Sequence, residues 1–240
     1  MKCLILAAGY ATRLYPLTEN FPKPLLDVQG KKILDWLIDD LGDLEYIVVT
    51  NHRFAPIFRD WAKTRPERIA VLDDGTSTNE TRLGAVRDIH FAIEQAGADD
   101  YLIIAGDNLL DFSLRSFVSY ASAKGTSCTM RYRETDENRL HRSGVAEVDG
   151  EERILSFEEK PAAPKSNWCT PPFYYYVASD VTRIPEAIAD GCGIDAPGSL
   201  VSWMCRHSVL HSMVMPGKRY DIGDLQSYEQ VQKDYNSLGQ

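Results

Sequence analysis

The sequence predicts an α/β protein in which a doubly wound, mostly parallel mixed sheet carries a small antiparallel lobe. Short apolar segments alternate with amphipathic segments through the first half of the 240 residues. That alternation indicates parallel strands joined by helical crossovers. Beyond residue 125, strand-like segments follow one another without long helices between them, which indicates antiparallel or mixed pairing.

The elements of the first half follow from apolar periodicity. The alternating pattern predicts strands at Cys3–Ala7, Tyr46–Thr50, Ile69–Leu72 and Tyr101–Ala105, and helices at Lys32–Leu41, Ala55–Lys63, Gly84–Gln95 and Ser113–Ala123.

The second half is richer in strands, and Asp149-Gly150 is a hairpin signal. We find no repeat and no Pro/Ser-rich linker, so we expect one domain whose two halves meet near residue 125. The pattern predicts strands at Ser127–Tyr132, Gly144–Val148, Ile154–Glu158, Phe173–Val177 and Leu210–Met215, and helices at Ile184–Ala189, Leu200–Arg206 and from Leu225 onward.

Composition excludes several classes of function. The net charge is −9, and no basic block is present, which argues against a nucleic-acid partner. No apolar run approaches the ~18 residues that a membrane span needs, and the start does not resemble a cleavable leader. The five cysteines are scattered without a C-x-x-C pair, which predicts free thiols in a reducing cytoplasm and no zinc site.

The first strand runs into a turn of small residues, Ala8–Ala11. Such a turn presents backbone N–H groups at the carboxyl end of a strand, where phosphates bind in open α/β sheets. Arg13 follows directly, and Lys23 stands between two prolines that fix the backbone on either side. These two cations suit a triphosphate; the alternative is that they are solvated surface charges. Neither a P-loop nor a dinucleotide fingerprint is present.

Two carboxylates are candidates for a metal site. Asp107 ends a buried strand, where a carboxylate can hold Mg²⁺ against phosphate oxygens, although it could instead cap a following helix. Asp221 lies in a short polar segment before the last helix. Asp224 is the better N-cap of that helix, which leaves Asp221 free for a metal.

A further charged segment, Phe157–Pro161, ends a predicted strand. Lys160 is fixed by the following proline and could hold a second phosphate, while Glu159 could accept hydroxyl hydrogen bonds from a polyol. The alternative is an ordinary hairpin end at the surface.

Together these segments resemble the sugar-1-phosphate nucleotidyltransferase family. Its signature is L-A-x-G-x-x-T-R-L-x-P-L-T followed by P-K-P-L-L. Residues 6–18 read LAAGYATRLYPLT, and residues 22–26 read PKPLL. Weaker motifs follow in family order at residues 105–108 (AGDN), 158–161 (EEKP) and 221–223 (DIG). The resemblance covers nearly the whole chain and is closest to short, single-domain members of the thymidylyltransferase and uridylyltransferase type.

The resemblance implies a Rossmann-like fold in one nucleotidyltransferase domain over residues 1–240. Residues 1–125 would form its nucleotide-binding half and residues 126–240 its acceptor-binding half. The implied reaction, in sugar-nucleotide biosynthesis, transfers an NMP from an NTP, with UTP or dTTP favoured, to a sugar 1-phosphate and releases pyrophosphate. Mg²⁺ is the implied cofactor. A cytoplasmic setting is expected, and the resemblance allows for a homo-oligomer.

The resemblance also assigns roles to residues. Arg13 and Lys23 are the implied catalytic residues, and Asp107 and Asp221 the implied metal ligands. The implied nucleotide-binding residues are Leu6, Ala7, Ala8, Gly9, Tyr10, Ala11, Thr12, Arg13, Lys23, Gly84 and Asp107, and the implied acceptor-binding residues are Asn108, Gly144, Glu159, Lys160 and Pro172.

The chain departs from the family pattern at three places. Ala8 and Ala11 stand where many relatives carry a second glycine, and an unusual polar run, 73–80, precedes the segment expected to face the base. Pro172 replaces a glycine of the strand that lines the sugar, which predicts an acceptor other than an ordinary hexose 1-phosphate.

Two alternatives therefore stay open. One is a cytidylyltransferase acting on a small phospho-alcohol or phosphonate. The other is a non-catalytic sugar-nucleotide sensor, which would be expected to have lost some of Arg13, Lys23, Asp107 and Asp221; all four are present.

Overall fold

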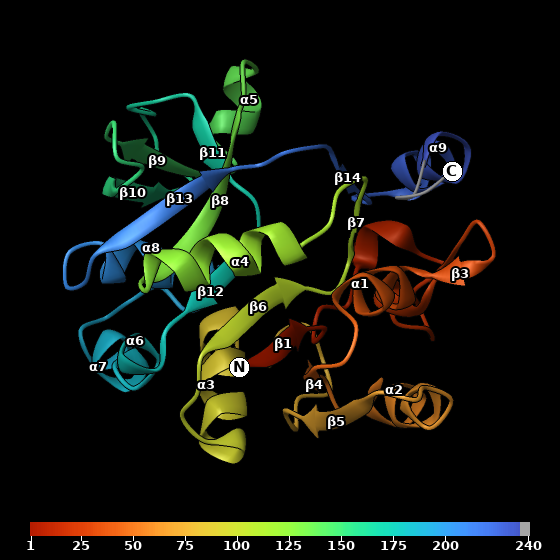
Figure 1. Cartoon of the computed structure of the whole chain (residues 1–240). Coiled ribbons are helices and arrows are strands. Elements are labelled where there is room, and N and C mark those ends of the chain that lie inside the picture. Colours follow the sequence, from red (N-terminus) through yellow and green to blue (C-terminus); the bar gives the residue numbers. More distant parts are fainter. Residues whose placement is uncertain (236–240) are drawn as a thin grey trace. The chain divides into compact units, whose positions relative to one another are not determined.

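The computed structural model describes residues 1–235 (Figure 1). The chain divides into two units. Unit 1 holds residues 1–2, 83–104 and 116–215; unit 2 holds residues 3–82 and 105–115 and the chain from residue 216. Each unit thus combines segments that are distant in the sequence. Residue 125 lies inside the segment 116–215 of unit 1, and the division into a nucleotide-binding and an acceptor-binding half stays a prediction.

The main sheet of unit 2 has the strand order β1-β4-β5, formed by β1 (Lys2–Leu6), β4 (Glu45–Thr50) and β5 (Arg68–Asp73). β4 and β5 run parallel, with Glu45 opposite Arg68 and Thr50 opposite Asp73. Their carboxyl ends therefore lie at one edge. The amphipathic helices α1 (Ile33–Leu41) and α2 (Ala55–Ala62) connect the strands, as the alternation of patterns predicts.

Two strand pairs and two short 3₁₀ turns of unit 2 have no clear signal in the sequence. A hairpin joins β2 (Asp27–Val28) to β3 (Lys31–Lys32), and β7 (Asn108–Leu110) pairs antiparallel with β14 (Arg219–Asp221). They were missed because two or three residues show no periodicity. The 3₁₀ turns are η1 (Thr12–Leu14) and η2 (Lys23–Leu25), and the last helix is α9 (Leu225–Asp234).

Asp224 caps α9, as predicted from the sequence. Its carboxylate accepts a hydrogen bond of 2.8 Å from the backbone N–H of Ser227, and the Ser227 hydroxyl lies 2.9 Å from the backbone nitrogen of Asp224. This reciprocal arrangement is a capping box, and it satisfies donors that the helix itself cannot.

We expect Asp224→Ala to lower the free energy of unfolding by about 1 kcal/mol, because it removes the acceptor for a helix N-terminal donor. Chemical denaturation measures this change. Asp224→Asn is the matched control, since an asparagine oxygen can cap equally well. An alanine variant as stable as the asparagine variant would contradict the prediction.

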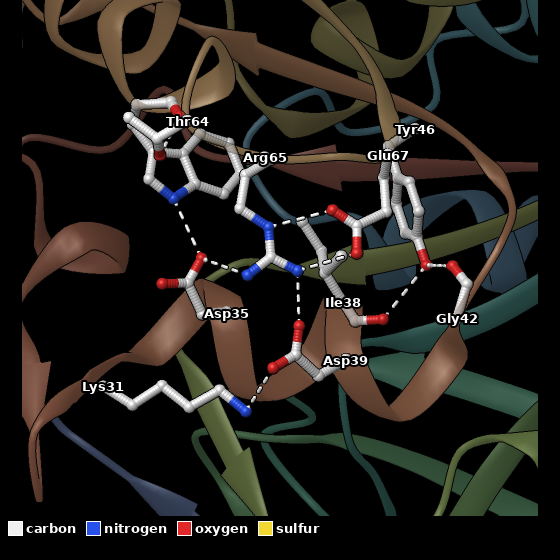
Figure 2. Close-up of polar contacts among 10 residues, drawn as sticks. Lys31, Asp35, Ile38, Asp39, Gly42, Tyr46, Thr64, Arg65 and Glu67 are labelled. Atoms are coloured by element: carbon white, nitrogen blue, oxygen red, sulfur yellow. Dashed lines mark hydrogen bonds and ion pairs between the residues drawn. The ribbon is translucent and has the colours of Figure 1, made fainter.

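A polar cluster around Arg65 joins α1 to the segment after α2 (Figure 2). The guanidinium contacts both carboxylate oxygens of Glu67, at 2.8 and 2.9 Å, and also Asp35 and Asp39. Asp35 accepts the indole N–H of Trp61, and Asp39 pairs with Lys31. Burial alone would raise the pKa of Asp39, but hydrogen bonds from Lys31 and Arg65 hold it below its usual value.

Arg65→Met is expected to lower the free energy of unfolding by about 3 kcal/mol at pH 7, because three carboxylates would lose their shared cation in a half-buried site. The loss should narrow as the pH falls below about 4, since stability from a carboxyl with a lowered pKa disappears as that carboxyl is protonated. Denaturation curves at several pH values measure both effects. The control is Arg68→Met at an exposed arginine; equal losses in the two variants would refute the prediction.

Unit 1 contains a mixed sheet with the strand order β10-β9-β11-β8-β12-β6 (Figure 1). A further strand, β13, is not part of this linear order and pairs parallel with β8. The pairs β10–β9, β11–β8, β11–β9, β12–β6 and β12–β8 run antiparallel. Its strands are β6 (Tyr101–Ala105), β8 (Ser127–Arg133), β9 (Gly144–Val148), β10 (Ile154–Glu159), β11 (Trp168–Thr170), β12 (Phe173–Tyr176) and β13 (Leu210–Val214).

The helices between these strands vary in length. The longest are α3 (Ala85–Ala96) and α4 (Arg115–Lys124). Arg115, the first residue of α4, belongs to unit 2. The shorter ones are α5 (Glu137–Leu140), α6 (Ala178–Val181), α7 (Ile184–Ala189) and α8 (Gly198–Met204).

The strands β11 and β12 both pair antiparallel with β8, one after the other along it. Cys169 lies opposite Tyr132, and Tyr174 lies opposite Thr129. Pro171 and Pro172 separate them, and neither proline has an N–H for a sheet ladder. The two prolines therefore interrupt what would otherwise be one longer strand.

The predicted fold class is confirmed: the chain is an α/β protein with a mixed sheet. The antiparallel share of the sheet is larger than predicted, because β12 runs antiparallel to β6 as well as to β8. The predicted helix Leu200–Arg206 is wrong by two residues at each end, since a Pro-Gly pair rather than an apolar residue begins it. The strand β11 and the helices α5 and α6 were not predicted; each has only three or four residues.

Two negative findings apply to the described residues 1–235. No helix there is long and apolar enough to cross a membrane. The five cysteines are free, as their spacing predicts.

Candidate active site

The loop after β1 presents backbone donors. Ala7 donates its N–H to Val49, whereas the N–H groups of Gly9 and Tyr10 have no hydrogen-bond partner within residues 1–235. Ala11 adopts the left-handed conformation at φ 48°, and its carbonyl accepts from the Thr18 hydroxyl at 2.8 Å. Hydrogen bonds at Ala7 and Ala11 thus fix the loop, while the N–H groups of Gly9 and Tyr10 stay available. This arrangement is expected of an anion-binding turn.

Lys23 is held against Asp107. The Lys23 ammonium lies 2.7 Å from Oδ2 of Asp107, and the lysine side chain is only 8% exposed. Pro22 and Pro24 flank it, and Lys23 opens the 3₁₀ turn η2. A Cβ at Gly106 would lie 2.9 Å from Cγ2 of Ile5. Because glycine has no Cβ, the turn that carries Asp107 can lie close to β1. A strand-end carboxylate and a buried cation therefore meet in unit 2.

Asp107 does not cap a helix, since β7 begins at the next residue. Its Oδ1 accepts a hydrogen bond of 3.0 Å from the Asn108 amide. Asn108 lies directly opposite Asp221 in the β7–β14 pair. Arg219 supports this arrangement: its Nη1 donates to Asn108 Oδ1 at 2.7 Å and lies 3.7 Å from Asp221 Oδ1. The strand pairing thus brings Asp107 and Asp221 to the same edge of unit 2.

Arg13 lies at the same edge of unit 2. Its side chain is exposed and makes no hydrogen bond or ion pair within residues 1–235. Its Nη1 lies 3.9 Å from the position that a Cβ on Gly223 would take, two residues beyond Asp221. Hydrogen bonds from Ser227 lower the pKa of Asp224, and the Arg13 charge adds to that effect. Arg13 is therefore a free cation beside the segment that carries Asp221.

The residues present fit a hard divalent cation. Mg²⁺ is usually held by one or two carboxylates together with substrate phosphates. Asp107 is 39% exposed and Asp221 is 61% exposed, so both can reach a ligand. Within the described residues no group of three or more His, Cys, Asp or Glu side chains could hold a metal alone. This donor set suits a metal that arrives with a phosphorylated ligand.

Unit 1 contains a second cluster, around Glu159. A Cβ at Gly144 would lie 3.1 Å from Glu159 Oε2, and a Cβ at Gly198 would lie 2.0 Å from the same atom. The two glycines thus make room for this carboxylate, and burial raises its pKa while the Lys160 charge offsets part of the rise. Lys160 has a left-handed φ of 49°, and its N–H donates to Ser143 at 3.0 Å. Strained backbone of this kind often marks a functional position.

Three predicted site residues have visible structural roles. Asn108 is 1% exposed. Its Nδ2 donates to the Ala105 carbonyl and to Asp107, and its Oδ1 accepts from Arg219. Gly84 has φ 90°, and a Cβ there would lie 2.6 Å from the Ile194 carbonyl oxygen, so it permits a close approach within unit 1. Pro172 interrupts the sheet. Ligand contacts by these residues stay predictions.

Two residues that shape these clusters, Arg219 and Gly198, were not among the predicted site residues. Arg219 aligns Asn108 and Asp221 but lies outside the recognised motif. Gly198 stands in the first turn of α8, although glycine is a poor helix former. That mismatch is the signal that could have revealed its close approach to Glu159.

The fold and these side chains define a class of protein: an α/β protein that collects cations and carboxylates at one edge of unit 2, in the segments that follow β1 and β6 and in β14. A family model described as "Nucleotidyl transferase" matches residues 2–237. The chain therefore belongs to the nucleotidyl transferase family.

Individual relatives agree with this assignment. The chain is 25% identical, over 94% of its length, to a glucose-1-phosphate adenylyltransferase of Fervidobacterium nodosum. It is 30% identical, over 78% of its length, to a glucose-1-phosphate thymidylyltransferase of Mycobacterium tuberculosis. These matches span 59% and 65% of the two relatives, so the chain corresponds to only part of each.

A solved structure supports the fold. A UDP-glucose pyrophosphorylase complexed with UDP-glucose aligns with a TM-score of 0.81 at 18% identity, over 98% of this chain and 97% of that chain.

Proposed function

We propose that this protein transfers a nucleoside monophosphate from an NTP to a sugar 1-phosphate and releases pyrophosphate. The observation that carries the proposal is the cluster of unit 2: Lys23 paired with Asp107, Asp221 on the neighbouring strand, and Arg13 free beside it. The relatives are named for reactions of glucose 1-phosphate with different nucleotides, so the acceptor class is better supported than the base. UTP and dTTP remain the favoured donors.

In this proposal an oxygen of the acceptor phosphate attacks the α-phosphorus of the NTP, and the bond to the leaving pyrophosphate breaks. The reaction needs no covalent enzyme intermediate, so positioning and charge neutralisation supply the rate enhancement. The donors of the loop at Gly9 would face the phosphates, and Arg13 would hold the β- and γ-phosphates. Lys23 would neutralise charge between the α-phosphate and the attacking oxygen. Lys160 would hold the acceptor phosphate.

Asp107 and Asp221 would hold Mg²⁺ in this proposal. When bound, Mg²⁺ supplies positive charge to the phosphate oxygens on which negative charge develops. Asp107 would also keep the Lys23 ammonium in place, because its Oδ2 lies 2.7 Å from that ammonium. We also propose a cytoplasmic setting, and a homo-oligomeric state is compatible with this function.

A pyrophosphate-release screen tests the proposal. Each common NTP is combined with a panel of sugar 1-phosphates, phosphocholine and aminoethylphosphonate, with Mg²⁺ and again with excess EDTA. We expect release with a sugar 1-phosphate that disappears with EDTA and returns with added Mg²⁺, while circular dichroism stays unchanged. Release with CTP and a phospho-alcohol alone would favour the cytidylyltransferase. Absence of release from folded protein would refute the enzyme, and sugar-nucleotide binding without turnover would then favour a sensor.

A further inference from the structure

A cavity of about 480 Å³ lies in unit 1 beside Lys160. It is lined by the end of β10 with the segment that follows it, by the loop after α7, and by α8. The Ser202 hydroxyl of α8 donates to the Phe157 carbonyl of β10 at 3.1 Å, which joins two of these walls. The volume is in the range of small-molecule sites. Because Glu159 and Lys160 both line it, this is the cavity that the proposed acceptor would occupy.

Two of the three acidic side chains that line this cavity, Glu158 and Asp190, have a side-chain partner. Glu158 pairs with Lys165 at 2.7 Å. Asp190 accepts the indole N–H of Trp203 at 3.0 Å. Glu159 is enclosed between two glycines, and burial raises its pKa. Glu158 and Asp190 therefore have partners, whereas Glu159 is partly buried and its carboxylate makes no hydrogen bond or ion pair within residues 1–235.

Two cations that line the cavity, Lys160 and Arg206, are without a side-chain partner within residues 1–235: neither makes a hydrogen bond or ion pair through its side chain. Arg206 is exposed and follows α8, where its backbone N–H donates to Trp203. Burial raises the pKa of the Cys192 thiol, and the Arg206 charge offsets part of that rise. The guanidinium therefore acts on a side chain that lines the same cavity.

A quaternary ammonium acceptor has no suitable surface in this cavity. Such a group binds on the open face of an aromatic ring. Trp203, the aromatic residue that lines the cavity, is 2% exposed. Its ring is stacked on His207 with centroids 3.9 Å apart, and the Arg183 guanidinium lies 5.0 Å from its centroid. The ring is therefore already occupied by neighbours.

We propose that Arg206 makes this cavity selective for a phosphorylated acceptor with a second anionic group, a sugar 1-phosphate that carries a carboxylate. The inference rests on the proposed function, in which Lys160 holds the reacting phosphate. Arg206 then remains for another anion, and its planar fork matches a carboxylate with two parallel hydrogen bonds. Arg206 is in this role a specificity-determining residue. An acceptor of this kind also agrees with the expectation that the acceptor is not an ordinary hexose 1-phosphate.

The test compares acceptors that differ in one group. Glucose 1-phosphate is paired with glucuronic acid 1-phosphate, and galactose 1-phosphate with galacturonic acid 1-phosphate, each with the NTP that supports turnover. For the uronic acid 1-phosphate that is the better substrate, we expect kcat/KM to exceed that of the matching neutral sugar 1-phosphate by about 10- to 100-fold. This is the range for a hydrogen-bonded charged group. In Arg206→Gln this ratio should fall toward one, mainly through a higher KM for the acid. Arg206→Lys should recover part of the ratio.

Arg153→Gln is the matched control, because Arg153 is exposed in the β9–β10 hairpin and does not line the cavity. It should retain the wild-type ratio. Turnover that favours the neutral sugars, or an equal ratio in wild type and Arg206→Gln, would overturn the inference and leave the proposed function standing. Absence of pyrophosphate release with every pair of substrates would overturn both.

Discussion

Lys23→Met is expected to lower kcat roughly 10³-fold with a sugar 1-phosphate and an NTP, the loss typical of a removed charge-stabilising group. Lys23 is nearly buried, and its ammonium lies 2.7 Å from Asp107 Oδ2. Methionine would leave this position without a positive charge. Methionine fills similar space, and Asp107 is exposed enough to be hydrated once its partner is lost. We therefore expect a change of less than about 1 kcal/mol in the free energy of unfolding.

Steady-state kinetics and chemical denaturation separate the two effects of this variant. Lys23→Arg is the control that retains the charge, and it should recover part of the activity. A methionine variant with kcat within a few-fold of wild type would remove Lys23 from the proposed mechanism. A variant that is inactive only because it unfolds would be recognised by its denaturation curve.

Arg13→Ala is expected to lower kcat/KM by roughly 10² or more, because it removes the cation proposed to hold the β- and γ-phosphates. Arg13 is exposed and makes no side-chain hydrogen bond or ion pair within the described residues. Its loss should therefore change the free energy of unfolding by no more than about 0.5 kcal/mol. This combination of a large kinetic effect and unchanged stability is the signature of a ligand-binding cation.

Arg68→Ala provides the comparison for Arg13, because Arg68 is also exposed but opens β5, at the edge of the parallel pair away from the carboxyl ends. It should leave kcat/KM unchanged. Equal kinetics in the two alanine variants would show that Arg13 is an ordinary surface charge. Inhibition by pyrophosphate adds an independent measurement, since Arg13→Ala should weaken it.

Much of unit 2 could be predicted from the sequence because its signals are local. The apolar strand before Ala8–Ala11 and the prolines around Lys23 each restrict the backbone within a few residues. Asp107 was expected at a strand end, and the structure places it 2.7 Å from Lys23. Asp224 was the predicted cap, and it forms a capping box. Each of these inferences needed only neighbouring residues.

The remainder depends on pairings between distant segments. Local reasoning left the role of Asp221 open, because its place beside Asn108 arises from β14 pairing with β7. The close approach of Gly198 to Glu159 also depends on distant segments, because α8 carries the glycine and β10 carries the carboxylate. Likewise, the sequence around Pro171 and Pro172 did not indicate that the strands on both sides of them lie along β8. No local pattern specifies which segments meet.

The pairing of β14 with β7 has a consequence for the order in which a nascent chain matures. Arg219 and Asn108 are 111 residues apart, whereas Lys23 and Asp107 are both synthesised well before β14. On the ribosome, the lysine–aspartate pair can form while Asp221 has not yet been translated. The second carboxylate would therefore reach its neighbour only after the segments that carry the lysine–aspartate pair have been made, so the proposed metal site would be completed after that pair.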